Sequence, residues 1–320
     1  GKIEKQNPRE EYFKYIVSNV KLDRKLKVAI DCGNGTASSW APELYEKMGC
    51  DVIPLYCKSD PNFPNHHPDP TVPENLTDLK KVVLEEKADV GLAFDGDGDR
   101  LGVVSDQGEI IWGDILQILF WRELLSKYPG ADVIVEVKCS QALIEEVKRL
   151  GGKPFFYKTG HSLIKAKMKE VEAVFTGEMS GHFFFADEYF GFDDALYAGA
   201  RLLRILSKAN EPISALLADV PKYYATPETR IGCPEEYKQK VIDVLIDRFR
   251  RKGYEIIDVD GLRVQFADGW GLVRASNTQP VLVARCEGRT PEALKSIARE
   301  LKEALSQIGE VEEFEWQFPE

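Results

Sequence analysis

The sequence has 320 residues, of which 43% are hydrophobic and 30% charged, and a formal net charge of −11. A chain of this length exceeds one ordinary hydrophobic core, so we expect two or three domains. Nucleic acids and anionic membranes are bound by extended basic surfaces, which this charge balance opposes, so neither is an expected partner. We find no apolar run long enough to span a bilayer and no signal peptide, and therefore expect a cytoplasmic protein.

The six cysteines form no Cys-x-x-Cys pair and are widely spaced along the sequence. They are Cys32, Cys50, Cys57, Cys139, Cys233 and Cys286. Three of them, Cys32, Cys139 and Cys286, adjoin predicted strands. We therefore expect buried free thiols in a reducing compartment rather than disulfides or a zinc site.

Strands and helices alternate through the first 107 residues. Helices are predicted at 9–20, 39–48 and 75–86, and strands at 27–31, 51–56 and 89–94. This alternation predicts a parallel sheet covered by helices. Residues 101–105 and 109–112 are predicted to pair as a hairpin around Asp106-Gln107-Gly108.

A second α/β segment of similar size follows. In the last hundred residues the predicted strands are instead grouped between two helices. The second segment has predicted helices at 113–127, 140–149, 161–169, 193–208 and after Pro212, and strands at 132–137, 154–157 and 172–176. The last segment has strands at 221–226, 254–259, 262–267, 271–275 and 281–286, and helices at 235–251 and 291–306. We predict an α/β protein: two α/β domains with mixed sheets (1–107 and 108–219), then an α+β domain with an antiparallel sheet (220–320).

The strongest chemical signal is Asp95-Gly96-Asp97-Gly98-Asp99-Arg100, directly after a predicted strand. Three carboxylates at alternate positions can face the same way, and hard oxygen ligands suit Mg²⁺. An EF-hand loop would need Gly and Glu where Arg100 and Asp106 stand. A solvated acidic turn would leave three like charges in mutual repulsion, so a metal site is favoured. Arg100 could neutralise excess charge or reach a phosphate or sugar oxygen.

A polar turn, Arg274-Ala275-Ser276-Asn277-Thr278-Gln279-Pro280, lies between two predicted strands. It concentrates a guanidinium, hydroxyls, amides and backbone N–H groups, as a phosphate site requires. Ser, Asn, Thr and Pro are equally common in ordinary β-turns, so the composition alone leaves both interpretations open.

Further polar groups follow the strands of the second segment. Gly177-Glu178-Met179-Ser180-Gly181-His182 could hydrogen-bond neighbouring sugar hydroxyls, or could be an ordinary glycine-rich loop. Lys138 and the stretch Lys158–Ser162 add basic or titratable groups at carboxyl ends of strands, where open α/β sheets bind ligands. Each could also be a surface residue.

Two other patterns that could suggest a functional site are interpreted as structural. His66 and His67 are adjacent and precede Pro68, so they do not share a helix face. Thr36-Ala37-Ser38-Ser39 stands where a helix is predicted to begin, and there a capping role is favoured over a nucleophilic serine.

Taken together, these loops resemble the α-D-phosphohexomutases, specifically the bacterial phosphomannomutase/phosphoglucomutase branch. The matching stretches run in order through the chain: Asp31–Gly35, Phe63–Pro70, Asp95–Arg100, Lys158–Ser162, Gly177–His182, Gly191–Asp194 and Arg274–Pro280. Methionine at position 179 favours the manno/gluco branch over the phosphoglucosamine mutases. The resemblance implies domains two, three and four of a four-domain enzyme.

The resemblance also implies roles for individual residues. Asp95, Asp97 and Asp99 would bind Mg²⁺, and Arg100 would lie beside the reacting phosphoryl group. Glu178 and Ser180 would contact sugar hydroxyls, and His182 of the same loop is included among the substrate-binding residues. The non-reacting phosphate would be held by Arg274, Ser276, Asn277 and Thr278. Lys138 and His161 match positions implicated in sugar contact or proton transfer.

One departure from the family is large. Its first domain supplies a Thr-Ala-Ser-His-Asn-Pro loop whose serine carries the phosphoryl group, and nothing in residues 1–320 matches that loop. The expected partners are hexose phosphate, hexose 1,6-bisphosphate and this first domain, in cis or in trans. We expect a monomer that binds phosphosugar weakly and lacks mutase turnover by itself. A non-catalytic phosphosugar-binding module and a phosphatase with Asp95 as nucleophile are the alternatives.

Overall fold

The computed structural model describes residues 1–276 and 279–319, so the candidate residues Asn277 and Thr278 lie outside the described part. The chain forms two compact units. Unit 1 comprises residues 1–133, 146–153 and 165–220, and unit 2 comprises 134–145, 154–164 and 221–320. Two stretches of the predicted second domain thus pack with the C-terminal region, and the division at about 107 and 220 stays a prediction.

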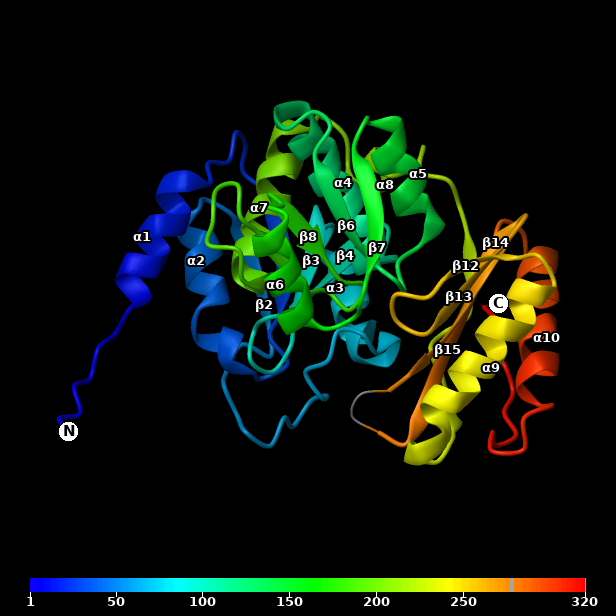
Figure 1. Cartoon of the computed structure of the whole chain (residues 1–320). Helices are drawn as coiled ribbons and strands as arrows, with labels where there is room; N and C mark the ends of the chain where they lie inside the picture. The colour runs from blue at the N-terminus through cyan, green and yellow to red at the C-terminus, as the bar shows by residue number, and fades with distance from the viewer. Residues whose placement is uncertain (277–278, 320) are drawn as a thin grey trace. The chain divides into compact units, whose positions relative to one another are not determined.

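Unit 1 is built on a five-stranded sheet in the order β2-β1-β3-β4-β5 (Figure 1). Strands β2 (Asp51–Leu55), β1 (Lys27–Asp31) and β3 (Val90–Phe94) are parallel. Strands β4 (Leu101–Ser105) and β5 (Ile110–Ile111) continue it as the predicted antiparallel hairpin. The sheet is therefore mixed, and the carboxyl ends of its three parallel strands share one edge.

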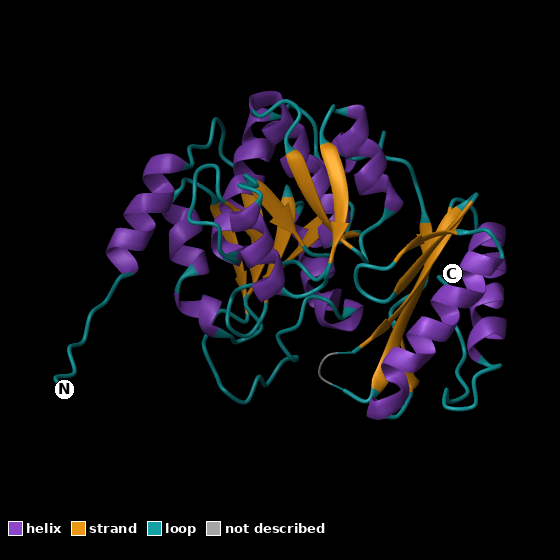
Figure 2. Cartoon of the chain, in the orientation of Figure 1, coloured by secondary structure: helices purple, strands orange, loops and turns teal. Residues whose placement is uncertain are grey.

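Helices surround this sheet (Figure 2). They are α1 (Arg9–Asn19), α2 (Ala41–Lys47), α3 (Thr77–Glu86), α4 (Gly113–Lys127), α7 (Ala195–Lys208) and α8 (Ile213–Leu216), with 3₁₀ helices η1 (Thr36–Ser39) and η2 (Pro73–Leu76). Leu79 and Val83 of α3 pack against Ala29 of β1 and Ala93 of β3. Helix α7 begins at a capping carboxylate, since Asp194 accepts a hydrogen bond from the Tyr197 N–H.

A short hairpin frames the glycine-rich loop predicted to contact sugar. Strand β8 (Phe175–Gly177) pairs antiparallel with β9 (Phe183–Phe185). Strand β9 was not predicted, because three consecutive phenylalanines show no alternation between two faces. All three are buried, and the Phe185 ring lies 4.4 Å from that of Phe175.

The remaining elements of the middle region are β6 (Asp132–Glu136), which pairs with β7 (Lys153–Tyr157), and helices α5 (Gln141–Arg149) and α6 (His161–Glu170). The C-terminal region carries an antiparallel sheet in the order β10-β15-β14-β13-β12, with β11 also paired to β15. Its strands are β10 (Tyr224–Ala225), β11 (Thr229–Gly232), β12 (Glu255–Ile257), β13 (Leu262–Phe266), β14 (Gly269–Ala275) and β15 (Val281–Gly288). Strand β11 is a second element that was not predicted.

Helices α9 (Lys238–Arg251) and α10 (Pro291–Leu305), with 3₁₀ helix η3 (Glu235–Tyr237), complete unit 2. Both long helices lie on one face of the sheet (Figure 1). Their apolar sides, including Leu245, Phe249 and Leu301, form one core with the strands. The predicted fold class, α/β followed by an antiparallel α+β region, is confirmed.

Three smaller predictions can be compared with the structure. All six cysteines are free, as expected, and Cys57 is partly exposed. The capping role proposed for Thr36–Ser39 is wrong, because these residues form η1 and neither η1 nor α2 has a side-chain cap. The structural interpretation of His66 is supported, because its Nε2 lies 3.0 Å from Asp31 Oδ2.

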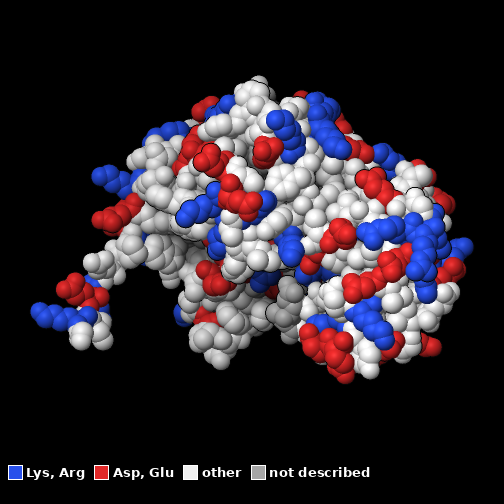
Figure 3. All heavy atoms as spheres, in the orientation of Figure 1, with Lys and Arg blue, Asp and Glu red and all other residues white. Residues whose placement is uncertain are grey.

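The charge distribution on the surface and the polarity of the helices can be compared with the amino-acid composition. Basic and acidic side chains are interspersed over the face seen in Figure 3. Among the residues that the structure describes, no helix has both the length and the apolar character needed to cross a bilayer.

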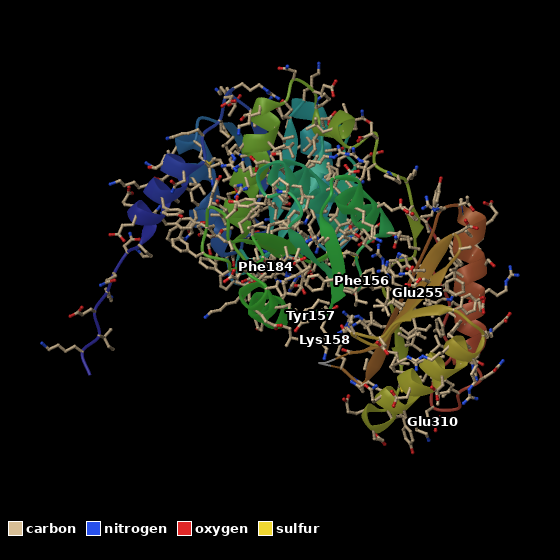
Figure 4. All side chains as sticks on the ribbon, turned by 45° about the horizontal axis from the view of Figure 1, so that its top comes forward. Phe156, Tyr157, Lys158, Phe184, Glu255 and Glu310 are labelled. Atoms are coloured by element: carbon tan, nitrogen blue, oxygen red, sulfur yellow. The ribbon has the colours of Figure 1, made fainter. Side chains whose placement is uncertain are left out.

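Arg263 fixes the segment after β6 to the C-terminal sheet within unit 2. Its guanidinium Nη1 donates to the carbonyl oxygens of Val137 at 2.6 Å and Cys139 at 2.9 Å. The guanidinium carbon lies 3.8 Å from the Trp270 ring centroid and 4.4 Å from that of Phe156, near the end of β7 (Figure 4). The side chain is fully buried, so these bonds form away from water.

We expect Arg263→Met to lower the free energy of unfolding of unit 2 by about 2–4 kcal/mol, because two buried carbonyls lose a charged donor. Urea unfolding followed by tryptophan fluorescence and circular dichroism measures the change. The matched control is Arg250→Met, which removes an ion pair whose side chains are 58% and 56% exposed. A control loss as large as that of Arg263→Met would contradict the role given to Arg263.

Candidate functional site

The aspartate-rich loop is organised by its first carboxylate. Asp95 Oδ1 accepts hydrogen bonds from the backbone N–H groups of Gly98 and Asp99 at 3.0 Å and of Arg100 at 3.1 Å. Gly98 has φ of 82°, a left-handed conformation that glycine adopts without strain. The loop therefore closes around a buried carboxylate, which holds the other two aspartates in place.

Arg100 completes this arrangement from the far end of the loop. Its Nε donates to Asp95 Oδ2 at 2.6 Å, and its Nη1 donates to Asp69 Oδ1 at 3.0 Å. Both oxygens of Asp95 thus accept hydrogen bonds within the loop. Asp69 comes from the proline-rich stretch interpreted above as structural, and the sequence does not predict its contact with Arg100.

The three aspartates of the loop can provide a cation site. Asp95, Asp97 and Asp99 each offer a carboxylate oxygen, and these atoms lie within 4.8 Å of one another. Burial raises the pKa of Asp95 to about 6, although Arg100 opposes the shift. A bound cation would favour the ionised form and relieve the repulsion among the three groups. An all-oxygen donor set of this kind fits Mg²⁺.

His182 connects this loop with the glycine-rich loop that follows β8. Its Nε2 lies 3.3 Å from Asp99 Oδ1, and its Nδ1 lies 2.9 Å from Glu178 Oε2. Burial alone would lower the pKa of His182, but the bonds to Asp99 and Glu178 outweigh it and raise the pKa to about 9. The hydrogen bond with His182 in turn lowers the pKa of Asp99 to about 2.

Asp99 and His182 also form a second group of potential ligands with Asp193. Both ring nitrogens of His182 are already engaged, Nε2 with Asp99 and Nδ1 with Glu178, and these contacts raise its pKa and so favour a protonated ring, which donates rather than ligates a metal. The all-carboxylate cluster is therefore the better cation site. Asp193 has a different cationic partner, because Lys165 Nζ donates to its Oδ1 at 2.8 Å.

The glycine-rich loop presents Glu178 and Ser180 beside the aspartate loop. Ser180 Oγ lies 3.0 Å from His182 Nδ1. The backbone supports the same association, since the Leu101 N–H donates to Gly181 O at 3.0 Å. The structure thus brings together six of the predicted residues within unit 1, in addition to Arg100, which is bonded to Asp95. They are Asp95, Asp97, Asp99, Glu178, Ser180 and His182.

Unit 2 holds a second group of predicted residues. Arg274 Nε donates to Asp260 Oδ2 at 2.9 Å, and the same oxygen accepts from the Thr159 N–H at 3.1 Å. Asp260 therefore joins the beginning of the polar turn to the Lys158–Ser162 stretch. Lys158 itself directly follows β7 (Figure 4), and His161 is the exposed first residue of α6.

Lys138 lies in a network of opposite charges within unit 2. Its Nζ is 2.9 Å from Glu228 Oε1 and 3.4 Å from Glu136 Oε1. Glu136 Oε1 also accepts from Thr159 Oγ1 at 2.8 Å. Burial would raise the pKa of Glu228, but Lys138, helped by Arg285 and Arg274, outweighs burial and lowers it. Lys138 is thus placed in the same network as the segment before His161.

The polar turn is anchored by a buried lysine that the sequence did not reveal as part of the site. Lys238 Nζ donates to the carbonyl oxygens of Ser276 at 2.5 Å and Gln279 at 3.0 Å. Ser276 Oγ accepts from the Gln279 N–H at 3.2 Å. Lys238, Asp260, Asp69 and Glu228 all escaped prediction, because each lies far along the chain from the loop it supports.

We expect the His182 contacts to make stability depend on pH in metal-free buffer. The pKa of His182 is near its ordinary 6.5 when unfolded and about 9 when folded. Its contribution is therefore complete below pH 6.5, and rising pH through 9 removes it. The free energy of unfolding of the wild type should exceed that of His182→Gln by up to about 3 kcal/mol at pH 6 and by little above pH 9.5.

Urea titrations with chelator between pH 6 and 10 measure this difference. His67→Gln is the matched control, because His67 is exposed and has no part in these contacts. Its pH profile should follow that of the wild type. A difference between wild type and His182→Gln that stays constant with pH would refute the assignment.

Comparison with protein families gives three consecutive matches along the chain. Residues 10–108 match domain II of phosphoglucomutase/phosphomannomutase, an alpha/beta/alpha domain. Residues 112–224 match alpha/beta/alpha domain III, and residues 211–304 match the C-terminal domain of the same family.

Individual relatives point to the same family as these three matches. The chain is 50% identical over 297 residues to a phosphomannomutase/phosphoglucomutase of Pseudomonas putida, covering 93% of this chain and 64% of the relative. A crystal structure of a phosphoglucomutase/phosphomannomutase family protein from Burkholderia thailandensis superposes with a TM-score of 0.90 at 46% identity, covering 95% of this chain and 65% of that one.

A more distant likeness concerns the fold alone. N-acetylphosphoglucosamine mutase of Aspergillus fumigatus, solved with GlcNAc-6P and magnesium, has a TM-score of 0.65 at 15% identity, over 92% of this chain and 68% of that one. The chain spans 64% of the length of its Pseudomonas putida relative. The succession of matched domains and the identity to these relatives show that the chain belongs to the phosphoglucomutase/phosphomannomutase family.

Proposed function

We propose that this chain provides the metal-binding, sugar-binding and phosphate-binding parts of a phosphohexomutase that interconverts hexose 1-phosphate and hexose 6-phosphate, with mannose, glucose or both as the sugar. The observation that carries the proposal is the joined pair of loops in unit 1. There His182 links the Asp95–Arg100 loop to Glu178 of the sugar loop. A non-catalytic phosphosugar-binding module would have little use for three clustered aspartates.

Asp95, Asp97 and Asp99 would hold Mg²⁺. The likeness in fold to a mutase solved with magnesium and a sugar phosphate supports this choice. When bound, the cation offsets the negative charge of a phosphoryl group in transfer. Arg100, already held between Asp95 and Asp69, would orient its remaining guanidinium N–H groups toward the same group.

The other predicted residues would bind and orient the sugar phosphate. Glu178, whose carboxylate is positioned by His182, would accept hydrogen bonds from sugar hydroxyls, with Ser180 beside it. In unit 2, Arg274, Ser276, Asn277 and Thr278 would bind the phosphate that is not transferred. Lys138 and His161 would contact the sugar or move a proton. The buried Lys238 holds the carbonyl oxygens of Ser276 and Gln279 in place, so these two residues would lose less entropy on binding.

The phosphoryl carrier would be a serine on a domain outside residues 1–320, in cis or in trans. That serine would give its phosphoryl group to the substrate, and the bisphosphorylated sugar would return its other phosphate. We also propose domains at 1–107, 108–219 and 220–320, a division supported by the three successive family matches. A monomer in the cytoplasm is part of the same proposal.

We expect the chain to bind Mg²⁺ and Asp97→Asn to weaken binding at least tenfold, because one of three anionic ligands is lost. Asp97 is exposed, so the substitution should leave the fold intact. Isothermal titration with MgCl₂ measures the affinity, and circular dichroism checks the fold. Asp247→Asn on α9 is the control, since it removes an equal charge at an exposed position. Equal Mg²⁺ affinities for the two variants would contradict the site.

We expect residues 1–320 alone to show no turnover of glucose 1-phosphate to glucose 6-phosphate. Adding a phosphoserine domain of a family relative, fused or as a separate polypeptide, should raise turnover above that of either part. Arg274→Met in the fused protein should raise KM at least tenfold through lost phosphate binding. A coupled dehydrogenase assay measures these rates. Turnover by residues 1–320 alone, or a covalent phosphate on Asp95, would overturn the proposed division of labour.

A further inference from the structure

Cys32 and Cys57 lie side by side although they are 25 positions apart in the sequence, and their Sγ atoms are separated by 3.2 Å. Each cysteine stands just beyond a strand of the parallel part of the sheet. Cys32 follows the last residue of β1 and Cys57 comes two positions after β2. Asp31 and Leu55, at the ends of these strands, are partners in register. The fold itself therefore brings the two thiols together.

We propose that Cys32 and Cys57 form a reversible disulfide when the protein meets a peroxide oxidant. The sulfur atoms need to approach by only about 1 Å to reach the disulfide bond length of roughly 2.05 Å. Cys57 is partly exposed and can be reached by a small oxidant, whereas Cys32 is buried beside it. This pairing is independent of the proposed mutase activity, because it rests on the sheet and on the two thiols alone.

The two side chains differ in a way that assigns an order to the reaction. The hydrogen bond with Cys57 and burial raise the pKa of the Cys32 thiol well above its usual value. Cys32 is thus poorly suited to react first. The Cys57 thiol is near the backbone oxygens of Leu55 at 3.1 Å and Ile30 at 3.7 Å, which hold it at the ends of both strands. The exposed thiol reacts first and the buried one resolves.

The chemistry is balanced with one molecule of hydrogen peroxide. The Cys57 sulfur attacks a peroxide oxygen, the O–O bond breaks, and the thiol proton leaves with the other oxygen as water, giving a sulfenic acid. The Cys32 sulfur then attacks the Cys57 sulfur. The S–O bond breaks, and the hydroxyl leaves with the Cys32 proton as a second water. Two thiols are oxidised, and one peroxide is reduced to two water molecules.

Oxidation of this pair would also constrain the neighbouring backbone, because the chain after Cys32 supports the Asp95–Arg100 loop. The Thr36 N–H donates to Gly96 O at 3.0 Å. A Cβ at position 35 would lie 3.0 Å from the same Gly96 oxygen, a tight contact that glycine avoids. A disulfide at Cys32 would therefore fix the segment on which the Asp95–Arg100 loop lies.

Treatment of the purified chain with hydrogen peroxide tests the proposal. We expect the titratable thiols to fall by two per chain. Non-reducing peptide mapping should yield one cross-linked species joining the peptides of Cys32 and Cys57. Dithiothreitol should restore both thiols. Because a cross-link restricts the unfolded chain, Tm should rise by a few degrees on oxidation and return on reduction.

Three serine variants provide the controls. Cys57→Ser and Cys32→Ser should each abolish the cross-link. Cys57→Ser changes a partly exposed residue, so it is informative even if the buried Cys32→Ser fails to fold. Cys50→Ser, at a buried cysteine of the same unit, should keep the cross-link. The proposal is overturned if both thiols remain titratable, if Cys57 proceeds to sulfinic acid while Cys32 stays reduced, or if the cross-link persists in Cys57→Ser.

Discussion

The site in unit 1 depends on one buried carboxylate. Asp95 follows a fully buried strand and satisfies three consecutive backbone N–H groups with one oxygen and the Arg100 guanidinium with the other. Without it, the loop would carry three unsatisfied donors and an arginine with one anionic partner fewer. The same carboxylate is costly to ionise, since burial raises its pKa. A bound divalent cation would resolve this conflict, because it would stabilise the charge that the loop geometry requires.

A single imidazolium then makes two loops into one site. His182 binds Asp99 through one ring nitrogen and Glu178 through the other, so its positive charge lies between two carboxylates. Each contact stabilises the protonated ring, and the ring lowers the pKa of Asp99. A substitution at His182 would therefore affect the Asp95–Arg100 loop and the Gly177–His182 loop together. Direct contact of His182 with substrate stays a prediction, and the structure adds to it the contacts with Asp99 and Glu178.

The sequence predicts well those helices and strands that depend on residues close together in the chain. The helix at 113–127 and the hairpin at 101–112 follow from local periodicity and turn residues, and both are confirmed. Strand β9 was missed, because Phe183–Phe185 has no period, and so was the short β11. The partners Asp69, Asp260, Glu228 and Lys238 were missed for a different reason. Each is an ordinary charged residue in sequence and gains its role only when distant strands and loops meet.

Unit 2 contains segments from two regions of the sequence, because residues 134–145 and 154–164 pack with residues 221–320. The segment carrying Lys138 belongs by sequence to the middle α/β region, yet Arg263 and Arg285 of the C-terminal sheet donate to the carbonyl oxygens of Val137, Lys138 and Cys139. Arg274 reaches the same neighbourhood through Asp260 and Thr159. These hydrogen bonds are short, mostly buried and charge-assisted, so they are expensive to break. Lys138 and Arg274 are therefore held by one framework, and a motion of the C-terminal sheet would carry both.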